Sequence, residues 1–221
     1  MITDEVIIRW KGLQDYLTCW DAMRAFTHQR NENTTDEIWL LEHPPVFTQG
    51  QNGKPEHILQ PGNIPVIKID RGGQVTYHGP GQLIVYALVD IQRKKINVRQ
   101  LVTLLENTVI ALLADFNISG FSKREAPGIY VDTKKICSVG LRIRRGSSYH
   151  GLAINVRMDL EPFSRINPCG FSELKMTQIS ELSEIPSIKE VSLHLTDHLL
   201  KNLGYTSGQF LMENNHATKS T

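Results

Sequence analysis

The clearest hydrophobic pattern in the chain is a helical one that starts near residue 97. Asn97 is a favoured N-cap residue, and Gln100 stands three positions later, where its side chain completes a capping box. Apolar residues then recur at helical spacing at Leu101, Leu105, Val109, Leu112 and Phe116. The pattern predicts an amphipathic helix whose apolar face covers a sheet.

Two more helices are predicted nearer the ends of the chain. The first runs from Gly12 to about Asn31. Its apolar positions are Leu13, Leu17, Trp20 and Met23 or Ala25. The second begins after Ser187, where Glu190 completes another capping box, and it ends at Gly204, a favoured stop residue.

Short β-branched and apolar runs predict the strands. They cover residues 6–10, 38–42, 46–48, 64–70, 83–89, 129–131, 136–143 and 149–156. Only short turns separate the last three, which is typical of an antiparallel meander. Strands that follow one another without a crossover helix favour the α+β class. We expect a single domain with a largely antiparallel or mixed sheet flanked by helices over residues 1–208, and a frayed polar tail over 209–221.

The amino-acid composition indicates which partners and which compartment to expect for this domain. The 221 residues include 24 Lys and Arg against 23 Asp and Glu, so no overall charge attracts nucleic acid or a membrane surface. The three cysteines, an odd number without a secretory leader, argue against a disulfide framework. No apolar run approaches the ~18 residues of a membrane helix. The sequence predicts a cytoplasmic protein with no nucleic-acid or membrane partner.

The stretch from Arg71 to Gln82 contains little that a hydrophobic core can use. It holds four glycines, one proline and one arginine between two predicted strands, 64–70 and 83–89, that are expected to be buried. Glycine permits positive φ and lets another molecule approach the backbone closely. The stretch therefore predicts a binding site, with an ordinary glycine-rich connection as the alternative.

Cys169 is the best candidate nucleophile. Pro168 fixes the chain before it and Gly170 frees the chain after it, a geometry that presents a side chain. Cys137 competes, but it sits mid-strand in an apolar setting where a thiol is inert, and Cys19 is expected to pack in or beside the core.

A thiol attacks only as the thiolate, so the cysteine needs a nearby positive charge or a base. The candidates are Lys135, Arg71, His78 and His150. Both histidines stand beside a glycine where a strand meets a loop, and Lys135 heads a predicted strand. Sequence spacing alone leaves the lysine and histidine alternatives open.

Four motifs in order point to a known family. They are RGGQVTYHGPGQ at 71–82, KICSVG at 135–140, HGLAIN at 150–155 and INPCG at 166–170. Together they closely resemble the lipoyl(octanoyl) transferase family, the octanoyl-[acyl-carrier-protein]:protein N-octanoyltransferases of lipoate biosynthesis. The resemblance covers about residues 42–170. It implies the fold of the biotin and lipoate protein ligase catalytic domain.

The resemblance also implies a thioester relay. The family takes octanoyl from the phosphopantetheine arm of acyl carrier protein onto its cysteine, here Cys169. It passes the acyl group to a lysine on lipoyl domains of 2-oxoacid dehydrogenase complexes and on the glycine cleavage carrier protein. The family's lysine, here Lys135, lies beside the cysteine and lowers the cysteine pKa. No ATP, other cofactor or metal is implied, since a thioester already carries its acyl group at high transfer potential.

The same resemblance implies which residues bind the substrate. The expected acyl-pocket residues are Arg71, Gly72, Gly73, Gln74, Val75, Thr76, Tyr77, His78, Ser138, Val139, Gly140, Gly151, Leu152 and Ala153. Backbone N–H groups at Gly72, Gly73, Gly140 and Gly151 are candidate donors to the oxyanion of the tetrahedral intermediates.

Three alternatives compete with this interpretation. An ATP-dependent lipoate or biotin ligase shares the fold but does not need Cys169. A non-catalytic module that binds carrier proteins is expected to have lost Lys135 or Cys169. A cysteine hydrolase that uses His78 or His150 releases free acid to water instead of transferring the acyl group.

Overall fold

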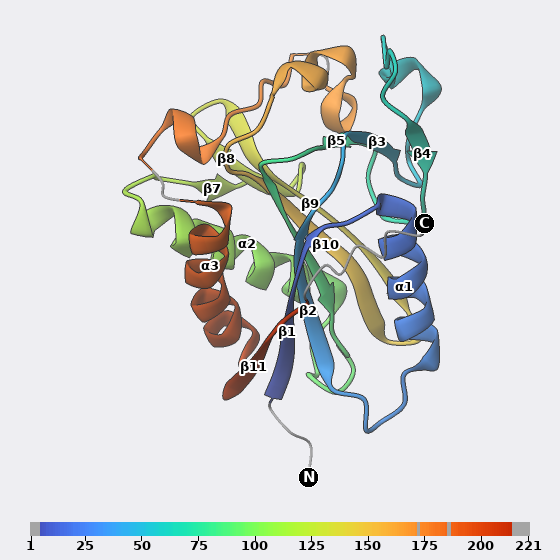
Figure 1. Cartoon of the computed structure of the whole chain (residues 1–221), viewed down its shortest axis with the longest axis vertical. Coiled ribbons are helices and arrows are strands. Elements are labelled where there is room, and N and C mark those ends of the chain that lie inside the picture. The colour runs from blue at the N-terminus through green and yellow to red at the C-terminus, as the bar shows by residue number, and fades with distance from the viewer. Residues whose placement is uncertain (1–4, 172, 185–186, 214–221) are drawn as a thin grey trace, which may run out of the picture.

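The computed structural model describes residues 5–171, 173–184 and 187–213, without the side chain of Cys169. Figure 1 shows a central sheet between helices. The helices are α1 (Tyr16–Gln29), α2 (Val98–Asp115) and α3 (Ile188–Leu203). The strands are β1 (Glu5–Leu13), β2 (Asp36–Glu42), β3 (Val46–Gln49), β4 (Val66–Lys68), β5 (Val75–His78), β6 (Gln82–Leu88), β7 (Phe121–Ser122), β8 (Gly128–Val131), β9 (Lys134–Arg144), β10 (Ser147–Asn155) and β11 (Ser207–Met212). Short 3₁₀ turns are η1 (Pro55–His57), η2 (Glu161–Arg165), η3 (Pro168–Gly170) and η4 (Ile179–Glu181).

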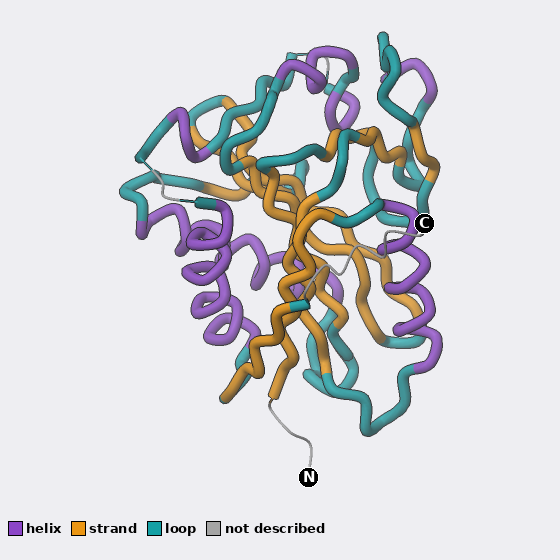
Figure 2. The backbone as a smooth tube through the Cα atoms, in the orientation of Figure 1, coloured by secondary structure: helices purple, strands orange, loops and turns teal. Residues whose placement is uncertain are grey.

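The large sheet is mixed. Its strand order is β11-β1-β2-β6-β10-β9-β8-β7. β1 pairs in parallel with β11 and β2, and the other neighbours pair antiparallel. A small sheet, β4-β3-β5, lies among loops and short helical turns (Figure 2). The predicted class, α+β with a mixed sheet flanked by helices, is confirmed, and so is the meander of β8, β9 and β10.

Apolar side chains pack on both faces of the large sheet. One core includes α2 and α3, and the other includes α1, in agreement with their positions in Figure 1. β6 contributes to both, because successive side chains of a strand point to opposite faces. Leu83 and Val85 belong to the first core, whereas Ile84 and Tyr86 belong to the second. No helix in the described residues is long and apolar enough to cross a membrane.

The predicted N-caps of α2 and α3 and the predicted stop of α3 are confirmed. The Asn97 side chain accepts from the Gln100 N–H at 2.9 Å, and the Gln100 side chain accepts from the Asn97 N–H at 2.8 Å. The Ser187 hydroxyl accepts from the Glu190 N–H at 3.2 Å. Gly204 ends α3 at a φ of 68°, the left-handed region that favours glycine.

α1 is a helix as predicted, but its buried face differs from the predicted one. Met23 is buried as predicted, but Leu13 and Leu17 are 51% and 46% exposed, and Tyr16 is buried instead. The reason is that β1 continues through Leu13, and Asp15 then caps the helix. Leu13 therefore belongs to the strand and not to the helix.

Three strand predictions need correction. Residues 75–78, within the stretch expected to be a loop, form β5 and are buried throughout. Residues 64–70, expected to be a buried strand, contain only the short edge strand β4, whose Val66 is 39% exposed. Residues 209–212 are not a frayed tail, because β11 pairs in parallel with β1 and Phe210 packs against the first core. Residues 214–221 lie outside the described part.

Candidate active site

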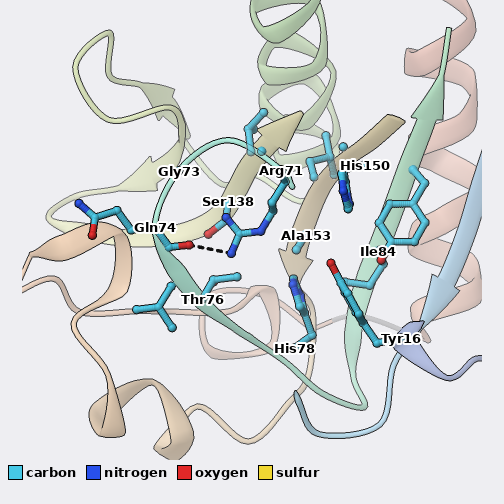
Figure 3. A pocket seen from close by; sticks show the side chains of 16 residues that line it. Tyr16, Arg71, Gly73, Gln74, Thr76, His78, Ile84, Ser138, His150 and Ala153 are labelled. Atoms are coloured by element: carbon cyan, nitrogen blue, oxygen red, sulfur yellow. Dashed lines mark hydrogen bonds between the residues drawn. The ribbon is translucent and has the colours of Figure 1, made fainter. Parts of the chain in front are cut away.

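Arg71 holds the glycine-rich loop in place. Its buried guanidinium donates to the carbonyl oxygens of Gly72 at 2.9 Å, Thr48 at 2.7 Å and Gln74 at 2.8 Å. Figure 3 draws the last of these bonds. A planar guanidinium presents several donors in a fixed arrangement, which suits three converging carbonyls. Gly73 adopts a φ of 83°, so the turn also needs glycine. Arg71 therefore determines the shape of the loop.

The loop forms one wall of a cavity, here called the acyl cavity. Its empty space, including the part open to solvent, is about 530 Å³. The loop, β9 and β10 bring together Arg71, Gly73, Gln74, Val75, Thr76, His78, Ser138, Val139, Gly140, Gly151, Leu152 and Ala153 around it. These are twelve of the fourteen residues expected to bind the acyl chain, and the first and last of them, Arg71 and Ala153, are 82 positions apart in the sequence.

Two of the expected residues lie elsewhere. The Tyr77 ring packs 5.4 Å from the rings of Phe47 and Phe163, because alternation along β5 turns it away from Thr76 and His78. Gly72 does not line the acyl cavity, and its N–H donates to Leu141 O at 2.9 Å. This bond to β9 corrects the expectation that the Gly72 N–H serves as an oxyanion donor.

Four other residues line the acyl cavity: Tyr16, Ile84, Tyr86 and His150. Figure 3 shows the labelled ones around the same space as the loop and β10 residues. Alternation along β6 could have indicated Ile84 and Tyr86, which share one face of the strand. His150 was a candidate base but not a pocket residue. Tyr16 comes from α1, and nothing in its local sequence marks it.

Two buried histidines near this cavity are neutral at physiological pH. His78 contacts Gln82 Oε1 through Nδ1 at 2.8 Å, and burial, reinforced by the neighbouring His43, lowers its pKa to about 3. His43 lies 2.6 Å from the Tyr86 hydroxyl, and burial lowers its pKa to about 4. Rings with such depressed pKa values are weak bases. His78 is therefore a poor activator for a cysteine hydrolase.

His150 is held by a carboxylate. Its Nε2 lies 3.0 Å from Asp70 Oδ1, which also accepts from the Trp20 ring N–H at 2.8 Å, and the Tyr149 hydroxyl donates to the same side chain. Burial raises the pKa of Asp70, but these hydrogen bonds together hold it well below its ordinary value. Burial lowers the pKa of His150, with Asp70 opposing. The pair fixes the orientation of the His150 ring at the cavity wall.

A second cavity adjoins the acyl cavity and contains Lys135. Gly73, Gln74, Val139 and Gly140 line both cavities. The second cavity, here called the lysine cavity, is also lined by Lys135 and Phe171. Tyr16 and Ile84 line the acyl cavity alone, and Figure 3 shows them on the side opposite the shared residues Gly73 and Gln74.

Lys135 is buried at the start of β9. It is 1% exposed, and its Nζ donates to Pro127 O at 2.9 Å and lies 5.3 Å from the centre of the Tyr130 ring. Its backbone is fixed by hydrogen bonds to Lys175 and Thr177. Lysine is rarely buried so completely in a merely structural role, so this position is a functional candidate.

The Cys169 side chain lies outside the described part, but its neighbours are placed. Its backbone belongs to η3. A Cβ atom on Gly170 would lie 2.7 Å from Nε2 of Gln74, so this turn packs against the glycine-rich loop. Phe171 lines the lysine cavity. The segment that carries Cys169 thus borders the cavity that contains Lys135.

The other two cysteines are buried, as the sequence predicts. Cys19 packs in the second core and Cys137 in the first. Burial raises the pKa of both thiols to about 12, so both remain protonated and unreactive near neutral pH.

Comparison with known proteins identifies the family. Residues 15–200 match the family described as the lipoyl protein ligase A/B catalytic domain. An octanoyltransferase from Pseudomonas syringae pv. syringae is 59% identical over 194 residues, which cover 88% of this chain and 89% of that protein. The chain belongs to the octanoyltransferase family. An octanoyltransferase from Vibrio vulnificus agrees, with 54% identity over 210 residues that cover 95% of this chain and 96% of that one. The resemblance found in the four motifs is confirmed, and the chain is an acyltransferase.

Solved structures of ligases share the octanoyltransferase fold. A bi-partite lipoate protein ligase from Thermoplasma acidophilum superimposes with a TM-score of 0.75 at 14% identity, covering 96% of this chain and 88% of that one. Biotin protein ligase from Aquifex aeolicus gives a TM-score of 0.53 at 16% identity, covering 90% and 68%. At these identities the likeness shows the fold alone, and it confirms the predicted ligase-like domain.

Proposed function

We propose that this enzyme carries its octanoyl group on Cys169, as a thioester, between two protein substrates. The donor is octanoyl-acyl carrier protein. The acceptor is the ε-amine of a lysine on lipoyl domains of 2-oxoacid dehydrogenase complexes or on the glycine cleavage carrier protein. Lys135 supplies the positive charge beside the thiolate and moves the protons. One observation carries the proposal: a lysine that is 1% exposed lines a cavity bordered by the segment of Cys169 and joined to the acyl cavity.

The first half-reaction loads the enzyme. The Cys169 thiolate attacks the carbonyl carbon of the donor, a C–S bond to Cys169 forms, and the C–S bond to the phosphopantetheine breaks. The Lys135 ammonium gives its proton to the departing thiolate, which leaves Lys135 as a neutral amine. A cysteine paired with a nearby cation is the usual activated form of this nucleophile.

The second half-reaction discharges the enzyme. The acceptor amine attacks the Cys169 thioester, a C–N bond forms, and the C–S bond breaks. The neutral Lys135 accepts the proton that the amine loses, and Cys169 leaves as the thiolate. The charges of the resting enzyme are thereby restored, so atoms and protons balance over one cycle.

The acyl cavity suits the eight-carbon chain. Ile84, Leu152 and Val75 give it apolar wall area, and each buried methylene contributes about 0.8 kcal/mol. We propose that the chain enters from the junction and ends near Ile84 and Tyr86. Because the incoming thioester is already activated, we propose that no nucleotide and no metal takes part.

The decisive experiment measures intact-protein mass after incubation with octanoyl-acyl carrier protein and without ATP. We expect the wild type to gain one octanoyl group and to lose it when an apo lipoyl domain is added. Cys169→Ser should form no hydroxylamine-labile thioester. Cys137→Ala, which removes a buried thiol outside both cavities, is the matched control and should load like the wild type.

Two results would refute the proposal. If the protein modifies the lipoyl domain only with octanoate and ATP, the ligase alternative holds. If Cys169→Ser transfers octanoyl at the wild-type rate, no thioester at Cys169 is needed.

A further inference from the structure

The carbonyl that accepts a hydrogen bond from the Lys135 amine belongs to a short segment, residues 126–128, here called the strap. Pro127 O accepts from Lys135 Nζ at 2.9 Å. A Cβ atom on Gly128 would lie 2.5 Å from Lys135 Cε and 3.0 Å from Nζ, and Gly128 adopts a φ of 132°. The strap thus touches the last part of the lysine side chain directly. Any movement of the strap displaces the amine.

Glu106 fixes the strap to α2. This residue is 7% exposed, and its Oε1 accepts from the Gly128 N–H at 2.8 Å. A second bond, from the Tyr130 hydroxyl to Ala126 O at 2.9 Å, holds the other end of the strap. The Gly128 bond is charge-assisted and buried, the kind that positions a backbone segment most firmly.

The charge of Glu106 also acts on its surroundings. Burial raises the pKa of Glu106, while the Gly128 N–H and the charge of Lys135 oppose that rise. Both charges also affect the pKa of the neighbouring Cys137. Burial raises this pKa, the charge of Lys135 lowers it, and the charge of Glu106 raises it. Glu106 and Lys135 therefore interact electrostatically across the strap.

The groups around Lys135 come from several elements. In the described residues they are Glu106 of α2, Glu125, which lines the same cavity, Tyr130 of β8, Cys137 of β9 and Lys175, whose carbonyl accepts from the Lys135 N–H. The Tyr130 ring offers its face to the amine, and Cys137 is a neutral thiol near physiological pH. Glu125 is exposed, so Glu106 is the buried carboxylate among these groups.

We propose that Glu106 is a positioning residue for the reaction: it anchors the strap that receives the Lys135 amine, and its carboxylate is the countercharge that favours the ammonium form of Lys135. The inference rests on the proposed function, in which Lys135 alternates between ammonium and amine. A carboxylate nearby favours the cation. The resting ion pair of Cys169 and Lys135 is then maintained to higher pH than it would be without Glu106.

The test is the pH dependence of kcat/KM for octanoyl-acyl carrier protein. Glu106→Gln keeps an oxygen acceptor for the Gly128 N–H but removes the charge. Loss of a negative charge favours deprotonation of both the lysine and the thiol, so both limbs of the pH profile should shift to lower pH, by about one unit. Asp197→Asn, which changes an exposed carboxylate of α3 that lines neither cavity, is the control and should give the wild-type profile.

The outcomes separate a positioning role from a structural one. If Glu106→Gln only lowers the Tm and leaves the profile unchanged, the inference is overturned. Glu106→Ala loses the acceptor as well and should lower kcat further than Glu106→Gln; equal rates would refute the anchoring role. Octanoyl loading of Cys169, measured in the same variants by mass, tests the proposed function separately, because a missing adduct in the wild type refutes that function whatever the profile shows.

Discussion

The far end of the acyl cavity should determine which chain length the enzyme prefers. Ile84 is 1% exposed and lines the acyl cavity on the side opposite Gly73 and Gln74, the residues shared with the lysine cavity. We expect Ile84→Ala to deepen the cavity, because it removes three carbon atoms from the wall. Decanoyl donors should then be used better relative to octanoyl donors.

The size of the effect follows from the buried area. Two further methylenes that enter the new space contribute about 0.8 kcal/mol each, or about 1.6 kcal/mol together. One factor of ten in rate corresponds to about 1.4 kcal/mol, so the ratio of kcat/KM for decanoyl over octanoyl donors should rise about 15-fold. The same substitution should destabilise the fold by about 2–5 kcal/mol, since it opens a void in the second core.

The assay compares kcat/KM for octanoyl and decanoyl thioesters of acyl carrier protein. Leu83→Ala is the matched control, because Leu83 is the preceding buried residue of β6 but points into the first core. It should destabilise the protein by a similar amount without changing the ratio. The reasoning fails if folded Ile84→Ala keeps the wild-type ratio, or if Leu83→Ala changes it equally.

Three further predictions concern stability and thiol chemistry. Asp36→Ala should destabilise the protein by about 3–5 kcal/mol in urea unfolding, because Asp36 is buried and pairs with two arginines, Arg93 among them at 2.6 Å; a loss below 1 kcal/mol would contradict this. His43 and His78 have folded-state pKa values of about 4 and 3, below the unfolded value near 6.5. Their contribution to the free energy of unfolding is complete above pH 6.5 and falls by up to about 1.4 kcal/mol per pH unit for each ring between pH 6.5 and 4. The protein should therefore be less stable at pH 5 than at pH 7 in urea unfolding, and equal free energies of unfolding at the two pH values would contradict this. Cys137, with a pKa of about 12, should resist iodoacetamide at pH 8 in peptide mapping of the native protein and react only after unfolding.

The sequence predicted correctly those helix ends and turns that depend on interactions between residues close together in the chain. The capping pairs at Asn97 and Ser187 marked where helices begin, because an N-cap bond involves residues only three positions apart. Gly204 marked the end of α3, since its φ of 68° suits glycine. The meander of β8 to β10 followed from short turns between apolar runs.

Other elements depended on contacts between distant segments. β5 escaped prediction because its polar residues are satisfied only after folding, as when His78 bonds Gln82 and contacts Thr48. β11 escaped because a short terminal strand is stabilised by its pairing with β1, more than 190 positions earlier. Burial of Tyr16 instead of Leu17 followed from the entry of α1 after β1.

The sequence by itself determined the chemistry that this protein has available: a glycine-rich loop, a lysine heading a strand and a cysteine after proline, in an order that matches one enzyme family. Those residues are informative because their types and spacing suffice to recognise the motifs. Only the tertiary structure decided that Lys135 is buried against Pro127, that Glu106 anchors the strap beside it, and that Ile84 and Tyr86 line the acyl cavity. Burial and proximity are properties of chain segments brought together by packing, and no local pattern records them.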